Sequence, residues 1–249
     1  RFEDAAAAVD DFLQSLADGA DQPEIVPAFQ SFLFQPGVPL VAARTPCGND
    51  GARLELSQQR YLPVGSTGER ERTWRVPVCA AYGDGSGERD RFCTLLEDAD
   101  TSVDIPGDAC PAWLMPNADG SGYYRFDLDA GGWSALLENF EALNEREALA
   151  LTGSLSAAYR SGDTGTDTLV QAFRILARSP ERELATRPLE DLREIHKYLA
   201  STDAARAGVE AFMRELYHPR LDALGWQAGA DEASETRLLR VALIEALAE

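Results

Sequence analysis

The feature that most constrains the fold is a single change of hydrophobic period near residues 113–128. Before this stretch, short segments alternate between apolar and polar residues, which is typical of strands with one buried face. After it, apolar residues recur at intervals of three and four, which is typical of amphipathic helices. A chain that changes period in this way is predicted to be a multi-domain α+β protein.

The sequence predicts three parts: residues 1–36, 37–128 and 129–249. In the first, residues 5–17 and 23–33 are predicted to form two helices, with Gly19 ending the earlier one. Two helices this short cannot bury their own apolar faces, so they are expected to lean on another domain.

The second part is predicted to be a β-sandwich of the seven-stranded type, because about seven short strands follow one another with turn residues between them. Leu54 and Leu56 are expected to point inward, as are Trp74, Val76 and Val78. Pro77 predicts an edge strand or a bulge, because proline cannot donate to a sheet. The predicted strands are residues 38–43, 52–58, 74–80, 92–96, 101–105, 112–115 and 122–128.

The third part is predicted to be a HEAT-like, solenoid-type array of antiparallel helices, from helix lengths alone. Asn144 and Glu147 have the spacing of a capping box. Ser179 predicts another helix start, Pro188 a break or kink, and Pro219 with Gly225 a later helix end. The predicted helices are residues 133–143, 144–160, 166–177 and 232–248, together with one that begins at about residue 180 and one that carries an apolar stripe at 209–216.

The last predicted helix is apolar on more than one side, which is typical of a helix packed in a core. We therefore expect that the array continues in a longer protein and that this piece self-associates through the exposed face of that helix. The chain begins with Arg1 rather than Met, which also indicates a piece of something longer.

The formal net charge of -19 is spread along the whole chain. Nucleic-acid binding requires clustered Lys and Arg, and anionic membranes attract the same residues, so neither partner is expected. No apolar run is long enough to span a bilayer.

The four cysteines, Cys47, Cys79, Cys93 and Cys110, all lie in the predicted β part. Their even number predicts two disulfides and an exported, periplasmic or extracellular protein. Cys79 and Cys93 fall on the two arms of one predicted hairpin, which favours that bond and leaves Cys47 with Cys110. The sequence alone allows three pairings, and four buried thiols are the alternative.

Residues with catalytic or metal-binding chemistry are few. The two histidines, His196 and His218, belong to no zinc-binding motif and are interpreted as structural. Residues 117–122 place oxygen side chains at alternate positions, as a calcium loop does, but position twelve is Leu128 rather than Glu, so a turn is favoured. The sequence predicts no catalytic, metal or cofactor-binding residue in this chain.

Several stretches resemble, in order, the gluzincin zinc aminopeptidases of the aminopeptidase N and puromycin-sensitive type. The family runs from a helix into Q-P-G-x-P-x-V, then through L-S-Q-x-R-F-L and W-x-I-P-L to W-x-x-x-N and G-Y-Y-R. Here Trp113, Asn117, Tyr123, Tyr124 and Arg125 carry the last two motifs. Ala118, Phe126, Leu128 and the cysteines depart from the family pattern. The matching stretches are FQSFLFQPGVPLV, LSQQRYLPVG, WRVPV, WLMPNADGSGYYRFDL, LDALGW and LLRVALIEALA.

The resemblance implies that residues 1–36 end a zinc-dependent catalytic domain, that 37–128 form its β-sandwich, and that 129–249 begin its helical domain. The family's zinc ligands and general base lie upstream, so none maps onto a residue here. Zinc is expected in the parent protein, where a zinc-bound water attacks the first peptide bond.

This piece would support and cover the active site, and the five motif residues would be structural at a domain joint. Peptides would be partners through the parent enzyme, as would the missing catalytic domain. The alternative is an independent protein-interaction module without enzymatic role.

Overall fold

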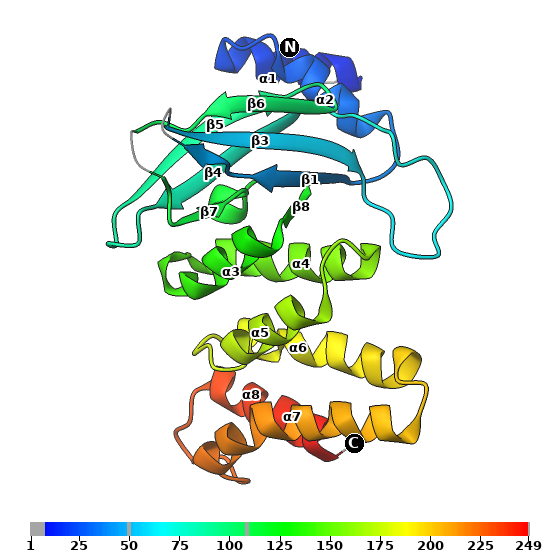
Figure 1. Cartoon of the computed structure of the whole chain (residues 1–249), viewed down its shortest axis with the longest axis vertical. Coiled ribbons are helices and arrows are strands. Elements are labelled where there is room, and N and C mark those ends of the chain that lie inside the picture. The colour runs from blue at the N-terminus through cyan, green and yellow to red at the C-terminus, as the bar shows by residue number, and fades with distance from the viewer. Residues whose placement is uncertain (1–7, 49–50, 108–109, 249) are drawn as a thin grey trace, which may run out of the picture. The chain divides into compact units, whose positions relative to one another are not determined.

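The fold is that of a computed structural model, which describes residues 8–48, 51–107 and 110–248 (Figure 1). The chain forms two compact units, residues 1–163 and 164–249, here called unit 1 and unit 2. Unit 1 contains two β-sheets and helices, and unit 2 is helical in its described part. The predicted mixture of helices and sheets is confirmed. The division of the chain into domains at residues 1–36, 37–128 and 129–249 stays a prediction.

Unit 1 begins with helices α1 (Val9–Ala20) and α2 (Ile25–Leu33), which pack against each other. The prediction that Gly19 ends α1 is wrong. Asp21 ends it instead, in a left-handed conformation with φ 53° and ψ 39°, while its N–H bonds the carbonyl oxygens of Ala17 and Asp18. The first residues of the predicted helix 5–17 lie outside the described part of the chain.

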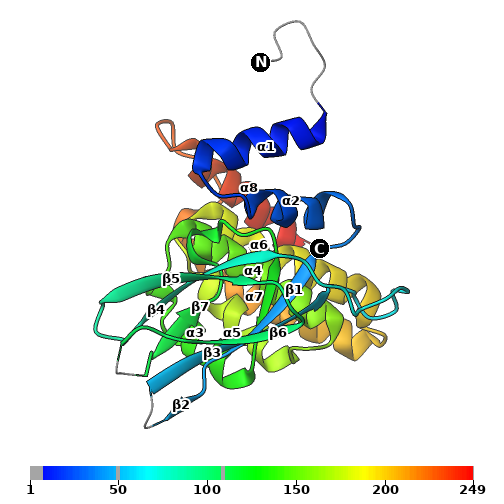
Figure 2. The same cartoon turned by 90° about the horizontal axis from the view of Figure 1, so that it is seen from above.

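The larger sheet has the strand order β2-β3-β1-β8, with β6 pairing with β3 as well. The smaller sheet has the order β5-β4-β7. Figure 2 shows β4 and β5 side by side along one flank of unit 1. The strands are β1 (Pro39–Arg44), β2 (Cys47–Gly48), β3 (Gly51–Arg60), β4 (Val76–Gly83), β5 (Arg89–Leu96), β6 (Asp100–Asp104), β7 (Trp113–Met115) and β8 (Arg125–Leu128).

Strands β1 and β8 pair in parallel, and their register places Leu40 opposite Arg125 and Ala43 opposite Leu128. The other strand pairs among the described residues are antiparallel. The first strand of the larger sheet, β1, and its last strand, β8, are therefore neighbours; α2 precedes β1 and α3 follows β8.

The expected inward residues of the sheets are confirmed. Leu54 and Leu56 of β3 are buried, as are Val76 and Val78 of β4 and Trp74 just before it. Pro77 lies in the middle strand of its sheet, so the predicted edge strand is wrong for β4 as a whole. The proline is tolerated because β7 pairs only with residues 81–83, which leaves β4 open on that side at Pro77.

Unit 1 ends with α3 (Ala130–Glu138), the 3₁₀ turn η2 (Phe140–Ala142) and α4 (Glu145–Ser161). Asn144 and Glu147 form the predicted capping box at the start of α4, which confirms that prediction. Figure 1 shows α3 and α4 on the side of the sheets opposite to α1 and α2.

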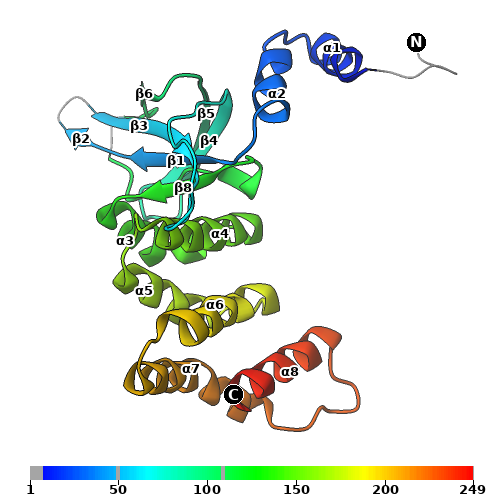
Figure 3. The same ribbon diagram turned by 90° about the vertical axis from the view of Figure 1, so that its right-hand side faces the viewer.

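Unit 2 contains α5 (Thr166–Leu176), α6 (Arg182–Glu194), the π-helical turn η3 (Ile195–Leu199), α7 (Asp203–Leu224) and α8 (Ser234–Ala248) (Figure 3). Of the break or kink predicted at Pro188, the break is wrong, because α6 continues through this residue and buries its ring. Pro219 likewise lies inside α7, and the helix ends at Leu224 with Gly225 as its cap. A proline removes one helical hydrogen bond, and burial of each helix against its neighbours outweighs that loss here.

Candidate functional site

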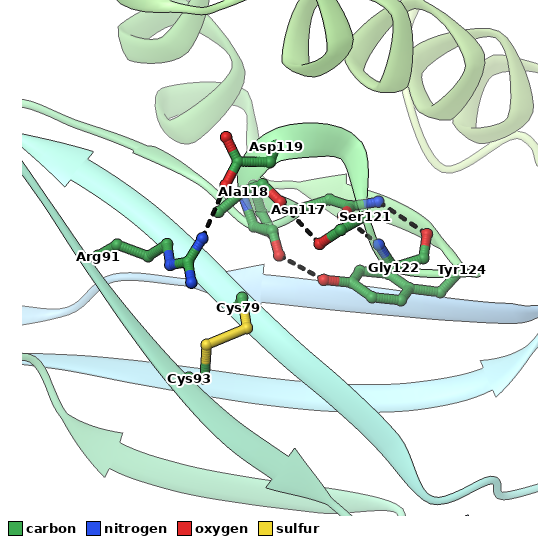
Figure 4. Close-up of a disulfide and its surroundings, with 10 residues drawn as sticks. Cys79, Arg91, Cys93, Asn117, Ala118, Asp119, Ser121, Gly122 and Tyr124 are labelled. Carbon is green, nitrogen blue, oxygen red and sulfur yellow. Dashed lines mark hydrogen bonds and ion pairs between the residues drawn. A yellow bond between two sulfur atoms is a disulfide. The ribbon is translucent and has the colours of Figure 1, made fainter. Parts of the chain in front are cut away.

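The loop that follows β7 is closed by one buried asparagine. Asn117 is 3% exposed, and its amide nitrogen donates to the Gly122 carbonyl at 3.0 Å. The Gly122 N–H donates back to the Asn117 side-chain oxygen at 2.8 Å (Figure 4). This reciprocal pair holds residues 117–122 in one conformation, much as a strand pair would.

Tyr124 lies beneath this loop with its ring buried. Its hydroxyl donates to the Pro116 carbonyl at 2.6 Å, and burial raises the pKa of Tyr124 well above its ordinary value (Figure 4). A Cβ on Gly122 would stand 2.1 Å from the Tyr124 ring, so only glycine fits there. The sequence G-Y-Y therefore encodes the close approach of a ring to the backbone.

A fully buried carboxylate joins this loop to α4 and β5. Glu147 has no exposed surface, and the two guanidinium nitrogens of Arg89 donate to its oxygens at 2.7 and 3.2 Å. The backbone N–H groups of Asp119 and Asn144 donate to the same two oxygens, each at 3.0 Å. Glu147 raises the pKa of the Arg89 guanidinium through that hydrogen bond. Four donors therefore compensate one desolvated charge.

A second, more exposed set of bonds parallels this one. Arg91 donates to Asp119 at 2.7 Å (Figure 4). Asn144 donates to the other carboxylate oxygen of Asp119 at 3.1 Å. Asp119 holds a left-handed backbone with φ 57°. Arg89 and Arg91 thus reach the loop and α4 from the same strand, β5. We call the set of five residues Arg89, Arg91, Asn117, Tyr124 and Glu147 the joint network.

Strand β8 packs on the helices through side chains of both faces. The Phe126 ring stacks on Trp133 of α3 with centroids 5.5 Å apart, and the Trp133 indole N–H donates to Asp127 at 2.9 Å. The Phe126 backbone N–H donates to the Ser154 hydroxyl of α4 at 3.2 Å. Arg125 lies against Gly153, where a Cβ would stand 2.5 Å from its guanidinium.

Two disulfides are present in unit 1, which confirms that prediction. Cys79 of β4 is bonded to Cys93 of β5, directly opposite in the antiparallel register (Figure 4). Cys47 of β2 is bonded to Cys110, a separation of 63 residues. Both bonds close segments of the β part, so unit 1 is covalently reinforced.

The structure brings together some of the expected motif residues and separates others. Trp113 is buried, with the Arg89 guanidinium 6.0 Å from its ring centroid, and Asn117 and Tyr124 are buried nearby. Tyr123 is 71% exposed and meets Phe32 of α2 edge to face. Arg125 is exposed, so packing at the joint rests on Trp113, Asn117 and Tyr124 more than on these two.

Sequence reasoning missed the partners of the capping box. Glu147 was expected only as a helix cap, and Arg89 and Arg91 were not singled out. The signal available in the sequence was the pair of arginines at alternate positions of one strand, which places both on the same face.

The two histidines each meet a carboxylate. His196 lies 3.1 Å from Glu210, and His218 lies 3.1 Å from Asp222. Among the residues that the structure describes, no group of three or more His, Cys, Asp or Glu side chains could hold a metal ion. Within the same residues, no helix is both long and apolar enough to cross a membrane.

The polar side chains of the joint network bind one another and the backbone, so the role of this arrangement is structural. It fixes a loop, a strand and a helix relative to one another within unit 1. No nucleophile with an adjacent base emerges from it.

Comparison with known proteins gives one family match. The family described as "ERAP1-like C-terminal domain" matches residues 113–249, so the match begins at the buried Trp113 of β7.

The chain is also similar to curated aminopeptidases over almost its full length. Aminopeptidase M1-A of Oryza sativa subsp. japonica is 26% identical over 260 residues, covering 100% of this chain and 28% of that protein. Endoplasmic reticulum aminopeptidase 2 of Bos taurus is 23% identical over 236 residues, covering 89% and 24%. Alanine/arginine aminopeptidase of Saccharomyces cerevisiae is 19% identical over 247 residues, covering 99% and 28%. The chain spans about a quarter of the length of these relatives.

Proposed function

Because this chain belongs to the ERAP1-like C-terminal domain family, we propose that it is the non-catalytic C-terminal part of a zinc-dependent metallo-aminopeptidase that removes N-terminal residues from peptides. The observation that carries the proposal is the family match over residues 113–249, together with relatives that are named aminopeptidases and align with the whole chain. In this role the piece supports and covers the active site and limits access of substrate.

The joint network supplies a physical basis for the supporting role. Its buried Glu147 and Arg89 connect a β-strand, a loop and a helix, so unit 1 is expected to behave as one rigid platform. A rigid platform holds neighbouring parts of an enzyme within the small tolerances that catalysis requires.

Zinc enters the proposal only through the part of the protein upstream of this chain. The described residues do not fit a zinc site, since the four cysteines are in disulfides and each histidine is beside a single carboxylate. No step of the reaction is therefore assigned to a residue here.

Residues 1–36 are proposed to be the helical tail of the catalytic domain. Helices α1 and α2 leave Phe12 58% and Leu33 54% exposed, and Phe34, the residue after α2, is 67% exposed. Such a surface favours contact with a further domain. In the same scheme residues 37–128 are the β-sandwich domain and residues 129–249 the start of a HEAT-like helical domain.

The two disulfides favour export to a periplasmic or extracellular compartment, because reducing compartments keep thiols reduced. Mass spectrometry of the protein from its native cells, under alkylation without reduction, tests this. Free Cys79 and Cys47 in that material would contradict export.

One observation favours a second function, an independent protein-interaction module that also self-associates. Leu238 and Val241 of α8 are each 52% exposed. Light scattering at high protein concentration is expected to show association that Leu238→Glu abolishes, and a strict monomer would contradict self-association.

Two measurements test the main proposal. The reading frame is expected to encode H-E-x-x-H about 150–200 residues upstream of Gln35, and its absence would favour the interaction module. The chain alone is expected to release no chromophore from aminoacyl chromogenic substrates and to bind no zinc. Robust turnover by the isolated chain would overturn the proposal.

A further inference from the structure

Unit 2 contains a pocket whose charge is opposite to that of the protein. Its volume is about 610 Å³. Among the residues that the structure describes, the charged and titratable ones that line it are Arg193, His196, Lys197, Arg206, Arg214 and one acid, Glu210. The whole chain carries a net charge of -19, so a concentration of bases at one hollow is not explained by composition.

The basic side chains come from successive elements of unit 2. Arg193 belongs to α6, His196 and Lys197 to η3, and Arg206 and Arg214 to α7. The π-helical turn η3 is closed by a bond of 2.8 Å from the Ala200 N–H to the Ile195 carbonyl. Turns of this type are rare and occur frequently at functional sites.

Neighbouring acids leave an excess of positive charge. Glu210 lies 3.1 Å from His196 and 3.8 Å from Arg214, so its charge is shared between two bases. Asp203 pairs with Arg206 at 3.0 Å while the other end of that guanidinium donates to the Ala200 carbonyl at 2.8 Å. Among the described side chains that line the pocket, four are permanent cations and one is a carboxylate, and the exposed Asp203 adds a second carboxylate beside Arg206.

The arrangement suits a ligand with several oxygens. A single carboxylate engages one guanidinium fork, whereas these cations surround a volume much larger than a carboxylate group. Apolar side chains complete the lining, namely Met213, Ala246 and Leu247. Charges at the wall of a hollow attract oppositely charged ligands more strongly than charges on a convex surface.

We propose that this pocket binds a small multivalent oxyanion of the phosphate class, such as pyrophosphate. The site is separate from the proposed role in an aminopeptidase and stands whether or not that role is correct. It involves no residue of the joint network.

Lys197 provides a direct probe, because it is the only lysine in the sequence. Pyridoxal phosphate forms an imine with an amine, releasing water, and borohydride reduces that imine to a stable label. The label can form only at Lys197 and at the N-terminal amine, which peptide mapping separates. We expect pyridoxal phosphate to label Lys197 at least about fivefold faster than pyridoxal, relative to the N-terminal amine, because the phosphate docks in the pocket. Pyrophosphate is expected to suppress that labelling.

Calorimetric titration of the chain in low salt measures binding directly. Pyrophosphate is expected to bind more tightly than orthophosphate, and Lys197→Gln and Arg214→Gln each to weaken it roughly tenfold through loss of a charge-assisted contact. Lys197→Arg retains the charge and is expected to retain binding while losing the label. Arg53→Gln, which changes an exposed ion pair in unit 1, is the matched control and is expected to leave binding unchanged.

Several outcomes would overturn the proposal. These are absence of pyrophosphate binding to the folded chain, binding that Arg53→Gln weakens as much as Arg214→Gln, and labelling of Lys197 that pyrophosphate does not suppress. Binding of citrate without binding of pyrophosphate would show that the pocket takes carboxylates and would reject the phosphate class. Circular dichroism of each variant ensures that a loss is measured on folded protein.

Discussion

Among the described residues, two ion pairs with a buried member, one in each unit, are built in opposite ways. In unit 1 the buried member is the acid: Glu147 is fully buried, while the side chain of Arg89 is 35% exposed. In unit 2 the buried member is the base: Arg240 has 5% of its side chain exposed and pairs with Glu232. Backbone N–H groups complete the shell of Glu147, and backbone carbonyl oxygens of Leu224 and Gly225 complete that of Arg240.

The two pairs also differ in what they connect. Arg89 and Glu147 are 58 residues apart and join a strand to a helix. Arg240 and Glu232 are 8 residues apart and fix the link between α7 and α8. In both pairs the buried charge is surrounded by backbone groups of the opposite polarity. The sequence separation of the two paired residues then decides whether the ion pair organises a whole unit or a single connection between helices.

The largest expected effect is on the long-range pair. Arg89→Ala leaves Glu147 as a buried charge without its cation, and we expect unit 1 to lose about 3 kcal/mol of stability. Urea unfolding followed by intrinsic fluorescence measures this. Arg91→Ala is the matched control, because Arg91 and Asp119 are about half exposed and such pairs contribute under about 1 kcal/mol. Equal losses in the two variants would contradict the special role of the buried pair.

A smaller effect is expected when the acid loses its charge and keeps its shape. Glu147→Gln places an amide NH₂ where two N–H donors now point, and we expect a loss of about 2 kcal/mol. Hydrogen exchange should rise in α4 and in residues 117–122 and stay unchanged in unit 2. A rise confined to the first turn of α4 would reduce Glu147 to an ordinary helix cap.

The local pair of unit 2 predicts a pH dependence. The hydrogen bond from Arg240 lowers the pKa of Glu232 below its ordinary value of 4.5. An acid with a lowered pKa in the folded state stabilises the fold above its unfolded pKa, and that stability is lost as the pH falls through the folded value.

Protection of residues 224–240 against hydrogen exchange is therefore expected to fall as the pH drops below about 4.5. In Glu232→Gln this component is expected to be absent. A mutant with the same pH profile as the wild-type chain would show that another group is responsible.

The smallest effect is expected at the rim of the joint. Arg125→Ala removes a guanidinium that lies over Gly153, and we expect a loss below about 1 kcal/mol, because the side chain is exposed. Thermal denaturation measures it. A melting temperature identical to that of the unsubstituted chain would mean that Arg125 contributes nothing to packing on α4.

Much of the fold of this chain was predictable because the predictions rest on local patterns. The strands of unit 1 alternate cleanly, and the capping box at Asn144 lies within four residues of sequence. The errors came from local rules that packing overrides. Pro188 is buried within a continuous α6, and Gly19 lies inside α1, where Asp21 supplies the left-handed cap instead.

The candidate site was predictable only in part. The motif from Trp113 to Arg125 marked the loop, and Asn117 and Tyr124 are indeed buried in it. The partners Arg89 and Glu147 lie far apart in sequence, and a pairing over that distance depends on the packing of β5 against α4. No pattern within a short window encodes that packing, so the joint network emerges only from the folded chain.

The parallel pairing of β1 with β8 has a mechanical consequence. Helix α2 enters β1 at its amino end, and α3 leaves β8 at its carboxyl end, with Leu40 opposite Arg125 and Ala43 opposite Leu128. A tension that draws α2 and α3 apart therefore acts along the strands and loads their hydrogen bonds in shear, all at once. Strands pulled in this direction resist separation more than strands that unzip one bond at a time, so this pair would act as the force-bearing link of unit 1.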